Sequence, residues 1–491
     1  MGTMAPHYTL AEGKICTLLY VESWLNSLGC PYASNITSIQ VRNGLGGGLV
    51  LLQDTQLIET LAHFSRERIP ERTFLGIAIV TLTPTKRAFG VFEVTHNCTD
   101  ITSASFLSTD TVRDVYGWAM KLYTDQGNLA WVFNNTPIFF IRDPIKFPSL
   151  NRSHKRHPQT NMTDANMVIS NFHVGNPGGI HEILHLFSDR GTPASIRHMN
   201  AYSGDTYKFT KEDGSFKYVK IHIKSHLGVA NLTREAAVKL ADLYDAIERG
   251  SYPIYNVYVQ VMDPREAETY KWNIFDMTRV WPHKDFPLRQ IGRLTLTRNP
   301  RNYFVDIEQA SFSPSTMVPG FAPSADPVLQ ARLFAYPDAA RYRLGVNYQQ
   351  LPTNASRSPV YCPFERDGFM NFSENYGDDP NYFGSSLRPT TFATDSQGKG
   401  RVASTLTEHE KWVGEVCSFT THIAEEDFEQ AAALWEVLGR ESGHQERFIG
   451  NVADHLRGVT DSRLRNMVYD LFSRVNSVLG DSIQIATEAS V

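Results

Sequence analysis

The string RLFAYPDAARYRLG, at residues 332–345, holds side chains whose types and spacing could do chemistry. Arg332 and Tyr336 are four residues apart, so they share one face if the segment is helical. A guanidinium beside a tyrosine favours the phenolate, because the opposite charge stabilises the ionised form of a group whose pKa is ordinarily about 10. A phenolate oxygen is a hard ligand that suits ferric iron. Arg341 and Arg343 follow, and either could bind a carboxylate as a bidentate fork.

The alternative for such a segment is an ordinary amphipathic helix, with its tyrosine in the core and its arginines in solvent. The residues of the string leave both interpretations open. Both predict a helix near 328–347.

The composition excludes several classes of protein. A net charge of −5 over 491 residues, without a visible Lys/Arg excess, argues against a nucleic-acid partner. The apolar stretch at 15–28 is interrupted by Glu22 and Asn26, and it is too short and too polar to cross a bilayer, so no membrane association is expected. The five cysteines are scattered, which is typical of a reducing compartment.

The pattern along the chain predicts an α+β protein in four parts. Residues 1–50 are glycine-rich and form an N-terminal arm, and residues 51–300 alternate short apolar runs with turns, which predicts an antiparallel β-barrel. Residues 301–415 are rich in Pro, Asn, Ser and Gly and form a long wrapping segment that contains the helix near 328–347. Residues 416–491 show apolar side chains at helical spacing, which predicts a C-terminal helical domain.

The string at 332–345 resembles the haem-ligand signature of the catalase family, and other blocks match that family in order. These blocks are FSRERIPER (64–72), AFGVFEVTH (88–96), NNTPIFFIRDP (134–144), FSDRG (187–191), VWPHKD (280–285) and LTRNPRNYF (296–304). The resemblance implies the catalase fold, a haem cofactor with its iron, and the disproportionation of hydrogen peroxide to water and oxygen. It also implies a homotetramer and a peroxisomal location; the C-terminal Ala-Ser-Val is not a peroxisomal signal of the Ser-Lys-Leu type, which leaves a cytoplasmic location as the alternative.

The resemblance also assigns roles to individual residues. Tyr336 falls on the proximal iron ligand and Arg332 on its partner, while Arg343 and Arg72 fall on contacts to the haem propionates. Asn134 falls on a distal asparagine that orients peroxide. The alternative for Asn134 is a turn former ahead of Thr-Pro.

The chain departs from the family on the distal side of the expected haem. The position of the distal histidine, a general base in the family, is Leu75, and residues 73–87 contain no histidine. Residues 97–109 replace a longer family stretch that includes a barrel strand, and we expect that strand to be missing unless residues 75–83 take its place. These abrupt departures predict impaired peroxide decomposition. The alternatives are an inactive haem- or NADPH-binding relative and a mis-spliced gene model.

A second site, for NADPH, is implied by the resemblance. Arg190 and Lys224 could bind phosphates, and Trp281 and His283 could pack on the dinucleotide. The alternative is a basic surface groove without a ligand. The matching residues are His181, Ser188, Arg190, Asn200, Lys224, Trp281 and His283.

Overall fold

The computed structural model describes residues 41–42, 49–50, 55–64, 87–94, 98–105, 113, 115–124, 126–154, 168–211, 213–231, 242–382, 385–386, 407–417 and 423–489. Arg72, Leu75 and most of the predicted N-terminal arm lie outside these residues. Within them, no helix combines the length and the apolar character needed to cross a membrane.

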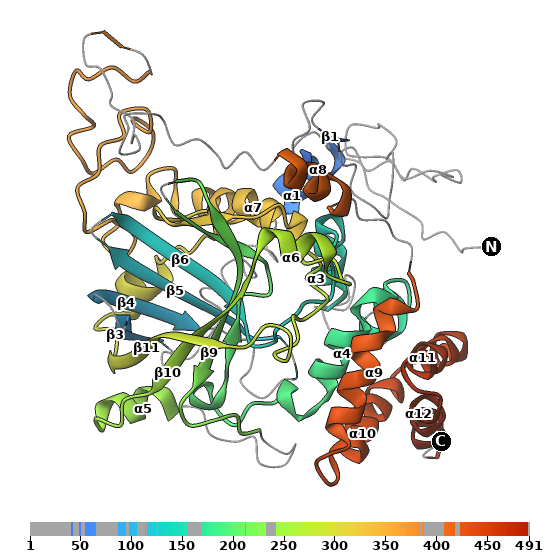
Figure 1. Cartoon of the computed structure of the whole chain (residues 1–491). Coiled ribbons are helices and arrows are strands. Elements are labelled where there is room, and N and C mark those ends of the chain that lie inside the picture. Colours follow the sequence, from blue (N-terminus) through green and yellow to red (C-terminus); the bar gives the residue numbers. More distant parts are fainter. Residues whose placement is uncertain are drawn as a thin grey trace, which may run out of the picture.

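A curled antiparallel sheet forms the main body of the protein (Figure 1). Its strand order is β10-β11-β3-β4-β5-β6-β7-β9, and β9 also pairs with β10, so the sheet closes on itself as a barrel. The strands β8 (Tyr207–Thr210) and β12 (Phe321–Pro323) extend the sheet beyond β9, and β1 (Val41–Arg42) pairs separately with β2 (Leu49–Val50). The strands of the closed ring are β3 (Arg87–Val94), β4 (Cys98–Ser105), β5 (Gly117–Thr124), β6 (Gly127–Asn134), β7 (Ala201–Tyr202), β9 (Phe216–Ser225), β10 (Ile254–Met262) and β11 (Arg289–Arg298).

The strands β5, β6 and β9 are buried on both faces over most of their length. On β9, Val219, Ile221 and Ile223 lie in the barrel core, as their alternation predicts. The alternation of Val219, Ile221 and Ile223 with Lys220, His222 and Lys224 predicts a half-buried strand, but Lys220 and His222 are buried as well. That part of the prediction is wrong, because loops and helices cover the outer face of this strand.

The strand expected to be missing is present. Residues Cys98–Ser105 form β4, which pairs with β3 on one side and with β5 on the other. The expectation of a gap that residues 75–83 would fill is therefore wrong, because the short bridging segment itself supplies the strand and its backbone hydrogen bonds. Residues 75–83 lie outside the described part of the chain.

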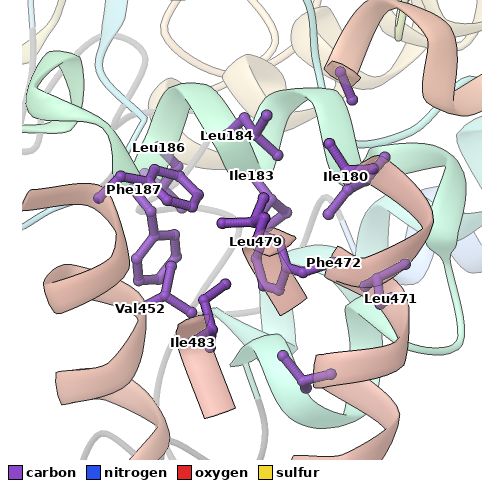
Figure 2. Close-up of a cluster of buried hydrophobic side chains, with 14 of the residues drawn as sticks. Ile180, Ile183, Leu184, Leu186, Phe187, Val452, Leu471, Phe472, Leu479 and Ile483 are labelled. Carbon is purple, nitrogen blue, oxygen red and sulfur yellow. The ribbon is translucent and has the colours of Figure 1, made fainter. Parts of the chain in front are cut away.

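Helices surround the barrel, and a group of them packs at one end of it (Figure 1). The helix α7 crosses the outside of the sheet, and α4 lies between the barrel and the C-terminal helices. Figure 2 shows the buried cluster in which Ile183, Leu184 and Phe187 of α4 meet Phe472 and Ile483 of that group. The helices are α1 (Thr55–Phe64), α3 (Phe147–Ser153), α4 (Ile180–Phe187), α5 (Asp242–Glu248), α6 (Pro264–Thr269), α7 (Pro327–Leu344), α8 (Thr407–Val416), α9 (Glu426–Leu438), α10 (His444–Leu456), α11 (Ser462–Val475) and α12 (Ser477–Glu488).

Candidate functional site

The helix α7 begins and ends with strong local signals. The Asp326 side chain accepts hydrogen bonds from the backbone of Val328 and Leu329, and Pro327 occupies the first helical position. The helix ends at Leu344 because Gly345 takes a positive φ of 97°. The predicted helix near 328–347 is thus observed at 327–344, and it carries Arg332, Tyr336 and Arg343.

Arg332 and Tyr336 meet on the inner face of α7, as their spacing predicts. The guanidinium carbon of Arg332 lies 5.2 Å from the centre of the Tyr336 ring. Arg332 also pairs with Asp205 and donates from Nη2 to the carbonyl of Val132 at 2.7 Å. Burial raises the pKa of Tyr336, and the charge of Arg332 and its hydrogen bond to the phenol oppose that rise. The predicted effect of the guanidinium is present, but in this chain burial outweighs it.

The surroundings of Tyr336 suit a planar cofactor with an iron to be ligated. Tyr336 is only 4 % exposed, and it packs against the small side chains Ala119 and Ala339 and against Val132 and Phe312. Ala119 and Val132 lie on the outer face of β5 and β6, whose inner face belongs to the barrel core. A buried phenol held by an arginine is the donor that haem proteins of the tyrosine-ligated type use. The donor chemistry of Tyr336 and Arg332 therefore fits a haem iron.

Arg343 lies two helical turns beyond Tyr336. Its Nη1 donates to the carbonyl of Glu308 and its Nη2 to the carbonyl of Ala310, both at 2.7 Å. The charge of Arg343 also lowers the pKa of Lys121 on β5, after the larger effect of burial. Arg343 is thus anchored beside the outer face of the sheet, as a contact to a cofactor edge requires.

Asn134 is the last residue of β6 and pairs in register with Gly117 and Tyr202. Because side chains alternate along a strand, Asn134 points to the same face as Val132, the face on which Tyr336 packs. The turn begins one residue later, where the Asn135 side chain accepts from the backbone of Tyr116 at 2.9 Å. The structure therefore places Asn134 in the strand rather than in the turn.

Two buried charged residues near Tyr336 were not identified from the sequence. Asp205 is fully buried, and burial raises the pKa of its carboxyl while Arg332 opposes the rise. Burial and the charge of Arg343 lower the pKa of Lys121 to about 7. The Lys121 ammonium lies 2.8 Å from Oδ1 of Asn354 and 5.1 Å from the centre of the Phe312 ring. No local pattern marks Asp205, whose partner lies 127 residues further along the chain.

Three of the seven residues expected at an NADPH site interact with one another. The charge of Arg190 lowers the pKa of Lys224, and that of Lys224 lowers the pKa of His283, in both cases after the larger effect of burial. The ring of His283 lies 5.7 Å from that of His222. Arg190 is exposed, so this basic group reaches the surface.

The other four residues expected there have partners within the protein. Trp281 is buried beneath Lys220, whose ammonium lies 5.6 Å from its ring, and Asn200 bonds to Tyr202 and to the backbone of Ser225. Ser188 donates to the carbonyl of His185 at 2.7 Å. His181 is buried on α4 with Nδ1 3.3 Å from the carbonyl oxygen of Thr278.

Comparisons with known proteins agree with this arrangement. The family model described as "Catalase" matches residues 25–109 and 108–389, in two segments that meet shortly after β4. The catalase of Schizosaccharomyces pombe is 44 % identical over an alignment of 503 positions, which covers 96 % of this chain and 94 % of that protein. The peroxisomal catalase of Candida boidinii is 43 % identical and covers 94 % of this chain and 96 % of its own length. The solved structure of catalase A from Saccharomyces cerevisiae superposes with a TM-score of 0.77 at 39 % identity, covering 95 % of this chain and 99 % of that one. The chain belongs to the catalase family.

Proposed function

We propose that this chain decomposes hydrogen peroxide to water and oxygen with a haem bound between α7 and the outer face of β5 and β6. The observation that carries the proposal is the buried Tyr336 phenol with the Arg332 guanidinium over its ring. Relatives that cover almost the whole chain and are named catalases support the same reaction.

Each residue of the site has a role that follows from its chemistry. A bound haem iron would supply the redox chemistry by which one peroxide is reduced and another is oxidised. Tyr336 would ligate the iron, and Arg332 would stabilise the phenolate while Asp205 holds the guanidinium in place. Arg343, and Arg72 outside the described residues, would contact the propionates. The Asn134 amide would orient peroxide on the sheet side.

The sequence lacks the histidine that serves as general base on the distal side of the haem in the family. In the family a histidine takes a proton from peroxide and returns it to the leaving oxygen, and Leu75 occupies its position. Loss of a general base typically lowers a rate by about 10²–10⁴. We therefore propose an impaired catalase. The alternatives are a haem- or NADPH-binding relative without turnover and the product of a mis-spliced gene model.

The proposal is tested by the absorption spectrum of the purified protein and by oxygen evolution from peroxide. The wild-type chain should show a Soret band and evolve oxygen at least about a hundredfold more slowly than a catalase that has the distal histidine. Full turnover would contradict the claimed need for that histidine, and the absence of a Soret band would contradict haem binding.

The role of Tyr336 is separated from the folding of α7 by two matched variants. Tyr336→Phe should lower haem retention at least about tenfold, since removing even a supporting contact of a metal ligand costs that much. Tyr342→Phe, on the same helix but exposed, should retain haem like the wild type. Equal haem retention in both variants would refute the ligand assignment.

The sequence of the messenger RNA tests the alternative of a mis-spliced gene model. Sequencing the transcript across codons 73–110 should return either the sequence as given or a longer family-like one. A transcript that reads through these codons unchanged excludes a faulty gene model.

NADPH binding is a second proposal, supported by the basic group of Arg190, Lys224 and His283. The charges of Arg190 and Lys224 suit the phosphates of a dinucleotide, and the 2′-phosphate should add affinity. Fluorescence titration with NADPH and with NADH measures this: NADPH should bind more tightly, and Lys224→Met should remove most of the difference. Equal affinities for the two nucleotides would contradict the site.

We also propose a peroxisomal location, because several fungal relatives are named peroxisomal catalases. A cytoplasmic location is the alternative. Fluorescence imaging of the chain with an N-terminal tag, beside a peroxisomal marker, distinguishes the two.

A further inference from the structure

Three polar side chains from β9, α6 and α8 form a chain of hydrogen bonds. The Tyr218 hydroxyl lies 2.8 Å from Nε2 of His409, and Nδ1 of His409 lies 2.7 Å from Oε1 of Glu268. An ionised carboxylate only accepts hydrogen bonds, so Nδ1 of His409 carries the proton that it donates to Glu268. Nε2 of the neutral ring then accepts from the Tyr218 hydroxyl. The imidazole is therefore held in the tautomer that can take the proton of the phenol.

The order of these groups is that of a nucleophile, its base and the carboxylate that orients the base. A nucleophile has to touch its substrate. Tyr218 is only 2 % exposed and His409 is buried, so a substrate would have to displace the packed side chains around them. Electron transfer needs no such contact, because electrons tunnel through packed protein. The burial of the phenol therefore favours one-electron chemistry over group transfer.

The surroundings of Tyr218 couple the loss of an electron to the loss of a proton. Burial raises the pKa of the phenol, so the residue holds its proton at rest. The rings of Phe216 and Phe275 lie against it, with centres 5.2 Å and 5.4 Å away. A phenol that loses only an electron becomes a cation, and an apolar environment disfavours that charge. The electron therefore leaves readily only if a neighbouring base accepts the proton, and His409 is that base.

Glu268 links the buried part of the chain of hydrogen bonds to solvent. Its side chain is 34 % exposed, whereas that of His409 is 3 % exposed. A proton that arrives at Nε2 of His409 displaces the Nδ1 proton toward a carboxylate in contact with water. The Trp412 ring is stacked on the imidazole, with centres 5.1 Å apart and planes inclined by 29°. This stacking helps to hold the ring in the plane of both hydrogen bonds.

Tyr218 also lies close to a residue on which the Tyr336 phenol acts. Tyr218 pairs in register with Lys208 of β8, and Tyr207 precedes that lysine. Burial raises the pKa of Tyr207, and the charge of Tyr336 adds to that rise. Tyr207 belongs to the barrel core and Tyr218 to a cluster on the other face of the sheet. An electron path from Tyr218 to Tyr336 can run through the paired backbone of β8 and β9 and the Tyr207 ring.

We propose that Tyr218 is a redox-active tyrosine that gives one electron to a one-electron oxidant while His409 takes its proton. In this step the phenol O–H bond breaks, and the oxidant gains the electron. The proton moves to Nε2 of His409 as the Nδ1 proton moves to Glu268. The product is a neutral tyrosyl radical. A haem that peroxide has oxidised is the oxidant that the proposed function supplies, and the proposal rests on that function only for this oxidant.

The test is electron paramagnetic resonance of samples frozen after mixing with peroxide. The wild type should show the signal of a tyrosyl radical, and ring-deuterated tyrosine should narrow it. Tyr218→Phe should lose most of this signal. Tyr255→Phe removes a buried hydroxyl that donates to the carbonyl of Ile196 at 2.9 Å rather than to a base, and it should keep the signal. Circular dichroism should show both variants folded.

The role of His409 has its own readout. His409→Phe leaves the phenol in place, and radical formation should slow at least about a hundredfold, the lower end of the usual effect of losing a general base. In the wild type, electron–nuclear double resonance should detect an exchangeable proton bonded to the radical oxygen, and His409→Phe should lack it. Glu268→Gln still accepts from Nδ1 and should retain that proton. An unchanged rate and an unchanged proton signal in His409→Phe would contradict the assignment.

A second oxidant separates this inference from the proposed function. The full-length protein is oxidised without peroxide by a photogenerated ruthenium(III) complex, which needs no haem. The wild type should again form the radical, and Tyr218→Phe should lose most of it. A radical in this experiment but not with peroxide would support Tyr218 and contradict the haem proposal. An equal signal in wild type and Tyr218→Phe with both oxidants overturns the inference. If Tyr218→Phe fails to fold, a ring-fluorinated tyrosine in place of Tyr218 decides, because a signal without fluorine splitting overturns it as well.

Discussion

Tyr336 and Lys121 show how burial acts on single residues at the proposed haem face. Burial favours the neutral form of any ionisable group, so it raises the pKa of the Tyr336 phenol and lowers that of the Lys121 ammonium to about 7. Arg332 opposes the effect on Tyr336, whereas Arg343 reinforces the effect on Lys121. The charges of the neighbouring arginines therefore favour the ionised form of Tyr336 and the neutral form of Lys121.

Lys121 predicts a rise of stability with pH. Between pH 7 and 10 the unfolded chain holds a proton on this lysine that the folded chain lacks, so the free energy of unfolding should increase by up to about 1.4 kcal/mol per pH unit. Lys121→Met should remove this slope, and Lys217→Met, at an exposed position, should keep it. Urea unfolding at pH 7, 8 and 9 measures the difference, and parallel profiles for wild type and Lys121→Met would contradict it.

At the scale of elements, a group of buried charges attaches α9 to the segments that follow β6 and α6. Asp427, in the first turn of α9, accepts from Arg142 at 2.7 Å and from Arg279 at 2.8 Å. Asp276 also forms an ion pair with Arg142, at 3.0 Å. Burial alone would raise the pKa of Asp427, but the hydrogen bonds and charges of the arginines lower it. Its contribution to stability is therefore present above pH about 4 and is lost as the pH falls through the lower folded pKa.

Removal of the Asp427 carboxylate should loosen α9. Asp427→Ala leaves two largely buried guanidinium groups short of a partner, and we expect a loss of about 3–5 kcal/mol in the free energy of unfolding. Glu429→Ala, exposed on the same helix, should change it by no more than about 0.5 kcal/mol. Thermal or denaturant unfolding followed by circular dichroism compares the two. Equal effects would mean that the ion pairs do not hold the helix.

At the scale of the whole molecule, the wrapping segment exposes apolar side chains. Phe369 is 87 % exposed and Phe372 60 %, and the segment that carries them extends away from the barrel at the upper left of Figure 1. Large apolar side chains gathered on one exposed segment indicate a protein interface. Other members of the group are Val360, Tyr361, Met370 and Tyr382. We propose that this segment packs on a neighbouring copy in the homotetramer that the resemblance to the catalase family implies.

The tetramer proposal predicts the effect of polar substitutions in this segment. The wild type should elute as a tetramer in size-exclusion chromatography with light scattering, and the double variant Phe369→Ser, Phe372→Ser should form smaller species. The double variant Val478→Ser, Ile485→Ser removes exposed apolar side chains from α12 and should remain tetrameric. A monomeric wild type at micromolar concentration would contradict the proposal.

Features that depend on neighbours in the chain could be predicted from the sequence. The helix near 328–347, the contact of Arg332 with Tyr336 and the antiparallel strands follow from local spacing, which sets which side chains share a face. The ordered sequence blocks also indicate the family by themselves. The strand at 98–105 was missed because its pairing depends on β3 and β5 rather than on its own pattern.

Only the tertiary structure decided which distant charges meet and which polar residues are buried. Asp205 reaches Arg332 across 127 residues, and Lys121 loses its contact with solvent because segments from the far half of the chain cover β5. His181 and His185 of α4 are buried because α4 packs against the C-terminal helices and the segment that carries Thr278. Sequence spacing determined the proximal pair, Arg332 and Tyr336. Burial, which only the folded chain creates, raises the pKa of the Tyr336 phenol even though Arg332 lies beside it, whereas Arg332 stays charged.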